Sequence, residues 1–273
     1  MSEAAEAARL ESIAGRLVQQ ARQRGADVAE ASASSGWELT AKVRLGEPEL
    51  VQEAGQRSVA LRVMRDQRVA VTSTSDWTDA GLDRCVSDAM ALVDLSERDE
   101  FAGPADPSLL SKGPYADLDL FDVSLDELGA EQALEYATRA ERNALDRDPR
   151  LTLSEGATWS RLSGWSALVL SSGFSAVRRG SFASLSVVPV VEDDGGKKRR
   201  GHYWTGARHL SSLEPLERVG ELAAQRTLRQ LGSRKVPTCQ VPIVFDTDAA
   251  RSLLGSFVGC ALGSSIWRKS SYL

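Results

Sequence analysis

The alternation of apolar and polar residues predicts a chain that begins with a helix and continues as strands. Residues 10–21 carry apolar side chains at three- and four-residue spacing, and Gly25 follows as a helix C-cap. Residues 37–45 alternate strictly, which is typical of a half-buried strand, and a turn is expected at 46–48. The runs 59–64 and 69–74 flank four polar residues and predict a hairpin.

Helical and strand patterns alternate again further along. A helix capped by Ser75 and Asp76 is expected first. Two more helices are expected over 125–146 and 213–231, and Ser124 and Glu127 fit a capping box at the start of the first of these. The segment 101–120 is rich in glycine and proline and is interpreted as a loop on the surface. Strands are expected at 151–160, 165–171, 181–191 and 243–245, and a last apolar helix spans 249–266.

This order of elements favours an α+β fold with antiparallel or mixed sheet layers packed against helices. We expect a boundary near 232–237. It divides the chain into residues 1–234 and residues 235–273.

Composition narrows the classes of function. Of the 273 residues, 42% are hydrophobic and 26% charged, as in ordinary globular proteins, and the net charge of −5 argues against a duplex-binding protein. The cluster Lys197-Lys198-Arg199-Arg200 follows acidic residues and two glycines, so we interpret it as a solvated hairpin tip. Neither a signal peptide nor a membrane span is visible, and we expect a cytoplasmic protein.

The residues that usually carry catalysis are scarce. The spacing of the two histidines, His202 and His209, matches neither the i, i+4 pair of a helical zinc site nor an H-x-H clamp. The three cysteines are too scattered for a zinc or disulfide motif. Cys85 lies on an apolar helix face and is expected to be a buried structural thiol. No nucleophile elbow, P-loop or dinucleotide fingerprint occurs.

Several stretches, taken in order, resemble the TldD/PmbA family. The most specific is Leu231-Gly232-Ser233-Arg234-Lys235-Val236-Pro237-Thr238 followed by Pro242-Ile243-Val244-Phe245-Asp246. Weaker matches lie at 58–76, 101–107, 154–156, 172–175 and 192–196. Family members continue well beyond this point into a β-rich C-terminal domain. The resemblance therefore implies that the chain covers the N-terminal portion and a truncated start of that domain.

The resemblance also implies what the last helix does. In the TldD branch this helix carries an HExxxH zinc motif, with two histidine ligands and a glutamate base. If Leu253-Leu254 aligns with the leucines before the motif, Gly255 and Cys260 replace the histidines, and Ser256 replaces the glutamate. These degenerate positions resemble the PmbA (TldE) branch, the zinc-less partner of the TldD metallopeptidase. No metal and no catalytic residue are expected in this chain.

The family resemblance implies a non-catalytic subunit of a cytosolic peptidase complex that processes unfolded or modified peptides. Its partner would be a TldD-like subunit that carries zinc, and neither nucleic acid nor membrane is an expected partner. Two alternatives stay open. One is a truncated fragment that only docks on a partner. The other is a cysteine-dependent hydrolase, with Cys260 or Cys239 as nucleophile and His202 or His209 as base.

Overall fold

A computed structural model describes residues 3–113 and 115–273. They form two compact units, Met1–Gly232 and Ser233–Leu273. Each unit has its own secondary structure.

The first unit is built on an antiparallel sheet of seven strands, in the order β3-β2-β1-β4-β5-β6, with β7 also pairing β5. The strands are β1 (Val28–Arg44), β2 (Glu47–Arg65), β3 (Arg68–Thr74), β4 (Leu153–Leu170), β5 (Ser175–Asp193), β6 (Lys197–Arg200) and β7 (Tyr203–Ala207). Four of them have 17 to 19 residues, well above the usual five or six. The α+β class is confirmed, and every pairing among the described strands is antiparallel.

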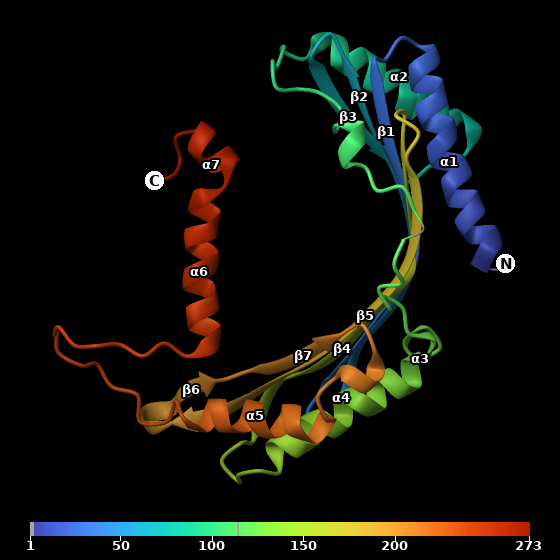
Figure 1. The fold of residues 1–273 in the computed structure, drawn as a ribbon. Coiled ribbons are helices and arrows are strands. Elements are labelled where there is room, and N and C mark those ends of the chain that lie inside the picture. The colour runs from blue at the N-terminus through green and yellow to red at the C-terminus, as the bar shows by residue number, and fades with distance from the viewer. Residues whose placement is uncertain (1–2, 114) are drawn as a thin grey trace. The chain divides into compact units, whose positions relative to one another are not determined.

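The sheet is strongly curved, and α-helices cover its convex face (Figure 1). The helices of this unit are α1 (Glu3–Gln23), α2 (Asp79–Leu95), α3 (Val123–Asp126), α4 (Ala130–Leu145) and α5 (Leu216–Leu228). Short 3-10 turns lie at Pro107–Leu109, Asp194–Gly196 and Leu210–Ser212. Ala33 and Leu39 of β1 are both buried and differ by an even number, so both point to the helical face.

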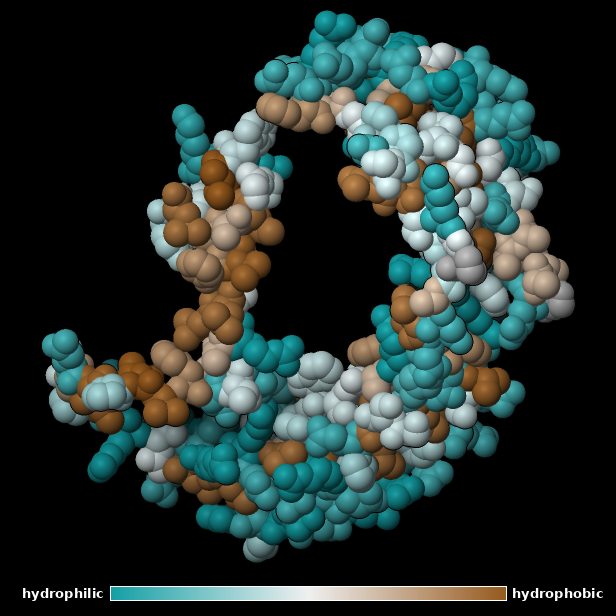
Figure 2. Space-filling model, in the orientation of Figure 1, coloured by the Kyte–Doolittle hydropathy of each residue, from teal (hydrophilic) through white to brown (hydrophobic). Residues whose placement is uncertain are grey.

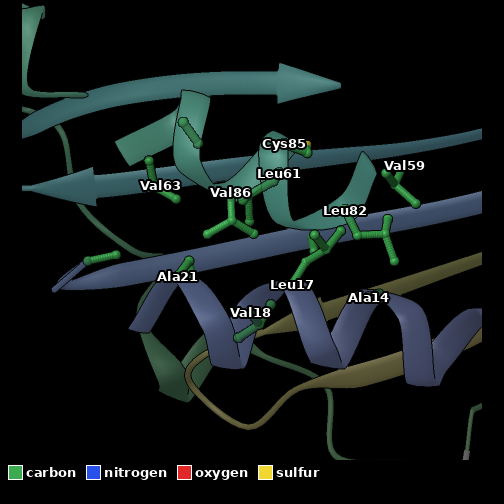
Figure 3. Close-up of a cluster of buried hydrophobic side chains, with 14 of the residues drawn as sticks. Ala14, Leu17, Val18, Ala21, Val59, Leu61, Val63, Leu82, Cys85 and Val86 are labelled. Carbon is green, nitrogen blue, oxygen red and sulfur yellow. The ribbon is translucent and has the colours of Figure 1, made fainter. Parts of the chain in front are cut away.

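Two separate cores lie on this one face. In the first, α1 and α2 pack on one end of the sheet through Leu17, Leu61, Leu82 and Val86, drawn in Figure 3. In the second, α4 and α5 pack on the other end around Trp159, which is fully buried against the edge of the Tyr136 ring, with the ring centroids 5.0 Å apart. Between them, β1 residues 34–38 belong to neither core. The long strands therefore connect two cores across an intervening stretch.

The continuity of the strands differs from the sequence prediction. The expected strands 151–160 and 165–171 are a single strand, β4, and the expected 181–191 begins earlier, at Ser175. The apolar alternation fades where β4 crosses between the cores at Arg161, Ser163 and Gly164, which explains the predicted break. The expected turn at 46–48 lies one residue earlier, at Leu45-Gly46, since Glu47 already pairs with Arg44.

Several helix boundaries and caps also differ from the sequence prediction. The expected helix 125–146 is two helices, because Gly129 interrupts it and serves as the N-cap of α4. Asp122, rather than Ser124, caps α3 by accepting a hydrogen bond from the Ser124 amide. The cap of α2 is Thr78, while Asp76 supports Thr78 through its amide and hydroxyl. The helix predicted over 213–231 is shorter, Leu216–Leu228, with Pro215 as its N-cap.

The basic cluster lies at a hairpin tip as expected, but its charges are paired. β6 follows the turn Asp194–Gly196 and pairs with the end of β5. Lys198 pairs with Glu192, Arg199 with Asp193, and Arg200 with Glu155. The acidic residues of β4 and β5 thus neutralise most of the cluster.

The second unit contains α6 (Thr247–Ala261) and α7 (Gly263–Trp267) and, within its described residues, no strand. The predicted strand 243–245 is wrong: this segment has no strand partner, and Val244 is almost fully exposed. The predicted helix 249–266 is present but breaks at Leu262, whose backbone is extended. Apolar side chains are exposed along α6, where brown residues gather in Figure 2. Leu254, Phe257 and Val258 are among the exposed apolar residues of this helix.

Candidate functional site

The three positions that the sequence predicts to be a degenerate metal motif lie on α6. Gly255 and Ser256 are successive residues, and Cys260 follows one turn after Ser256. Nothing lies within 4 Å of the place that a side chain at Gly255 would occupy. The Ser256 hydroxyl donates to the Ser252 carbonyl at 3.0 Å, and Cys260 is a partly exposed free thiol.

These residues do not fit a zinc ion. A zinc site needs at least three protein donors, and glycine supplies none. The serine hydroxyl is already engaged within its own helix, which leaves one thiol. Across residues 3–113 and 115–273, no group of three or more His, Cys, Asp or Glu side chains is placed to hold a metal ion.

The histidines and the other cysteines lie in different surroundings. His202 is exposed between β6 and β7, and His209 Nε2 lies 2.8 Å from the Asp119 carbonyl oxygen. Both belong to the first unit, whereas Cys239 and Cys260 belong to the second. Cys85 is buried in the first core, as predicted.

A glycine row crosses the sheet between the two cores. Gly36 of β1 lies opposite Gly164 of β4, and Gly164 lies opposite Gly180 of β5. A Cβ on Gly164 would lie 2.4 Å from the Ser35 carbonyl oxygen, and one on Gly36 would lie 2.7 Å from that of Ser163. The strands approach too closely for side chains here. Glycine therefore permits the close approach where the sheet curves between its helical layers.

A hollow of about 400 Å³ lies at this row. Even-numbered residues of β1, β4 and β5 point to the concave face, opposite the helices. On that face, the residues beside the glycine row are Ser58, Ser34, Ser166 and Arg178, which are successive cross-strand partners. Arg208 also lines the hollow, and its Nη1 lies 3.7 Å from the position that a Cβ of Gly180 would occupy. The sequence pattern did not single out any of these residues.

Asp122 and Ser181 hold the backbone beside Arg208, a residue that lines the hollow. Its carboxylate accepts from the Ser124 amide at 2.8 Å and the Leu210 amide at 2.7 Å, and its own amide donates to Ser181 Oγ. Ser181 Oγ in turn donates to the Arg208 carbonyl oxygen at 2.8 Å. Burial raises the pKa of Asp122, but the Leu210 and Ser124 hydrogen bonds outweigh it and lower that pKa below 3.8.

The lowered pKa predicts a pH-dependent contribution of Asp122 to stability. A carboxylate whose pKa is depressed by folding stabilises the protein above its unfolded pKa, and this stabilisation is lost as the pH falls through the folded pKa. Asp122→Asn is expected to be less stable than the parent at pH 7, with a smaller difference at pH 3. Urea unfolding at the two pH values measures this. Asp88→Asn removes an exposed carboxylate with the same charge change and serves as control; equal pH dependence of both variants would contradict the prediction.

On the convex side, Arg179 connects the helices to the sheet between the cores. Its guanidinium pairs with Glu3 of α1 and, at 2.9 Å, with Asp126 of α3. The same group lies 3.4 Å from the centroid of the Phe121 ring. Arg179 is thereby engaged on that side of the sheet, unlike Arg178.

Two protein-family models match this chain. The model for PmbA/TldA metallopeptidase domain 1 matches residues 29–93, and the model for the central domain of the same metallopeptidases matches residues 124–231. Together they span most of the first unit. The chain belongs to the PmbA/TldD family.

Curated relatives from the PmbA/TldD family agree with this assignment. The metalloprotease PmbA of Escherichia coli O157:H7 is 32% identical over 90% of this chain, and the PmbA homologue of Haemophilus influenzae is 29% identical over 86%. The match covers 54% and 51% of those proteins. The chain thus spans about half the length of the curated relatives it matches.

Solved structures of the PmbA/TldD family share the fold. A proposed DNA gyrase modulator from Bacteroides thetaiotaomicron superposes with a TM-score of 0.88 at 23% identity, covering 96% of this chain and 59% of that one. TldE from Thermococcus kodakarensis gives 0.66 at 16% identity, covering 79% and 47%. At these identities the likeness establishes the fold.

Among the described residues, no helix is both long and apolar enough to cross a membrane.

Proposed function

We propose that this chain is a non-catalytic, PmbA/TldE-like subunit of a cytosolic zinc metallopeptidase complex, in which a TldD-like partner carries the zinc. The complex would process unfolded or modified peptides. The proposal is supported by the donor set on α6: if Leu253-Leu254 aligns with the leucines before the zinc motif, Gly255, Ser256 and Cys260 replace its residues, and these three do not provide the donors of a zinc site.

In this role the chain would bind and orient peptide while the partner supplies the metal-activated water. The curved sheet offers a long concave face with small side chains near the glycine row, which leaves room for an extended peptide. The exposed apolar residues of α6, such as Leu254 and Phe257, support a second part of the proposal. Residues 235–273 would begin a further domain whose other elements cover this face.

The proposal predicts that the purified chain contains well under one zinc per molecule and does not cleave an unstructured fluorogenic peptide. Addition of a TldD-like chain from the same genome is expected to give cleavage that a chelator abolishes. Metal analysis by mass spectrometry and a fluorescence assay measure both. Stoichiometric zinc together with cleavage by this chain alone would refute the proposal.

Cys239 and Cys260 allow the cysteine-hydrolase alternative to be tested in the same assay. Cys239→Ser and Cys260→Ser are expected to leave the activity of the mixed complex unchanged, because no chemistry is assigned to either thiol. Loss of activity in one variant, with partner binding intact in size-exclusion chromatography, would favour that alternative.

A further inference from the structure

Two arginines at the hollow on the concave face lack an acidic partner. Arg178 and Arg208 are both exposed, and no carboxylate of the described residues forms an ion pair with either. The other arginines of this hollow are engaged. Arg179 pairs with Glu3 and Asp126, and Arg57 Nε donates to the Ser75 carbonyl oxygen. Two guanidinium groups therefore face the hollow with their donors available.

No described acidic residue lines the hollow, and the nearest acids on this face have other partners. Glu38 lies on the same face, one cross-strand row beyond the glycines, and its carboxylate accepts from Gln56 Nε2 at 3.0 Å. Asp119 interacts with the neighbouring His209, at 3.4 Å from Nε2. The hollow is thus locally basic within a chain of net charge −5.

Neutral hydrogen-bond donors extend the basic group across the sheet. Ser58, Ser34 and Ser166 form one cross-strand row that ends at Arg178, and their hydroxyls have no hydrogen-bond partner within residues 3–113 and 115–273. Neighbouring strands lie about 4.8 Å apart, so the hydroxyls follow one another at intervals that an extended ligand can span. Charged and hydroxyl donors together favour an anionic oxygen group as the ligand.

On the opposite side of the glycine row, β4 and β5 present apolar side chains, next to Glu38 of β1. There, Leu162 and Phe182 are cross-strand partners, and their side chains are 50% and 43% exposed. A ligand that contacts both rows needs an anionic group and an apolar group a few ångströms apart. A peptide with a carboxylate has both.

We propose that the hollow formed by Arg178, Arg208 and the serine row is a binding site for the carboxylate of an extended peptide. The guanidinium groups hold the carboxylate oxygens, and Leu162 and Phe182 contact the neighbouring apolar side chain. This inference rests on the proposed function only for the peptide nature of the ligand. It adds a preference for acidic peptides and assigns the residues that impose it.

Fluorescence anisotropy with three labelled octapeptides of one Ala/Ser/Leu sequence tests the site in the 273-residue chain. One peptide has a free C-terminal carboxylate and no acidic side chain. The second is amidated and has a central Glu, and the third is amidated and has Gln in its place. Binding of the first peptide alone shows that the site accepts C-terminal carboxylates, and binding of the second alone shows that it accepts acidic side chains. Binding of both shows that it accepts a carboxylate from either source. Equal affinity of all three, or no binding, would overturn the proposal.

Arg178→Gln and Arg208→Gln are each expected to weaken binding of the preferred peptide about tenfold, since each removes charge-assisted hydrogen bonds at a partly solvated site. Arg98→Gln is the matched control, because Arg98 is exposed and lies outside the hollow. Thermal melting verifies that each variant is folded. Unchanged affinity in both hollow variants would refute the site. These measurements use the chain alone, so they are independent of whether a zinc-bearing partner assembles with it.

Discussion

Replacing Gly164 with alanine is expected to lower the free energy of unfolding by about 3 kcal/mol. The added methyl group would lie 2.4 Å from the Ser35 carbonyl oxygen and 2.7 Å from Gly36 Cα. Both contacts are backbone atoms of a neighbouring strand, so no side chain can rotate away. β1 and β4 would have to separate at the middle of a pairing that runs from Glu30 to Val43.

Urea unfolding measures the effect, and Gly15→Ala provides the matched control. Gly15 lies inside α1, and nothing lies within 4 Å of the position that its Cβ would take. Alanine favours helix over glycine by about 1 kcal/mol, so this variant is expected to be more stable than the parent. The same substitution is therefore expected to lower the free energy of unfolding at position 164 and to raise it at position 15. A Gly164→Ala protein as stable as the parent would show that the strands are free to relax between the cores.

Glu141→Ala is expected to cost about 3 kcal/mol of unfolding free energy, because it removes the acceptor of two amides in the β1–β2 turn. Glu141 is almost fully buried, and its carboxylate accepts from Leu45 N at 3.0 Å and Gly46 N at 2.9 Å. Leu45 has a φ of 52°, a left-handed conformation that is unfavourable for a residue with a branched side chain. The carboxylate holds this turn in place from α4.

Two further variants separate the hydrogen bonds from the loss of volume. Glu141→Gln keeps the shape and one acceptor oxygen, so about half of the loss is expected. Glu135→Ala makes the same truncation on the exposed side of α4, where its ion pair with Arg139 contributes at most about 0.5 kcal/mol. Urea unfolding of the three variants gives the ranking, and equal losses for Glu141→Ala and Glu135→Ala would contradict it.

The sequence predicted the elements better than their connections. Alternation located the strands, since Leu39, Ala41 and Val43 each face a core. It divided β4 at Arg161 and Ser163, which are buried on the helical face but polar, because periodicity reports apolar side chains and these are absent there. A strand was expected at 243–245 from local apolar content, but a strand also needs a partner, which local pattern does not supply.

The glycine row and the hollow were not predictable in this way. Gly36, Gly164 and Gly180 are far apart in sequence and become neighbours only through strand register. Arg178 and Arg208 have no motif, and their significance depends on which carboxylates the fold places elsewhere. In contrast, Gly255, Ser256 and Cys260 were assigned by resemblance to a family. The structure places them on α6, and their correspondence with the zinc motif of the TldD branch remains a prediction.

The two cores on one face restrict how the length of β1 can change. Ala33 and Leu39 both face the helical side because their positions in β1 differ by an even number. Insertion of one residue between them would turn Leu39, Ala41 and Val43 toward the concave face while leaving Ala29, Ala31 and Ala33 in place. Insertion of two residues would restore their direction, provided that β2 and β4 lengthen equally. Related chains can therefore change the distance between the two cores only by steps of two residues, and adjacent strands must change by the same number.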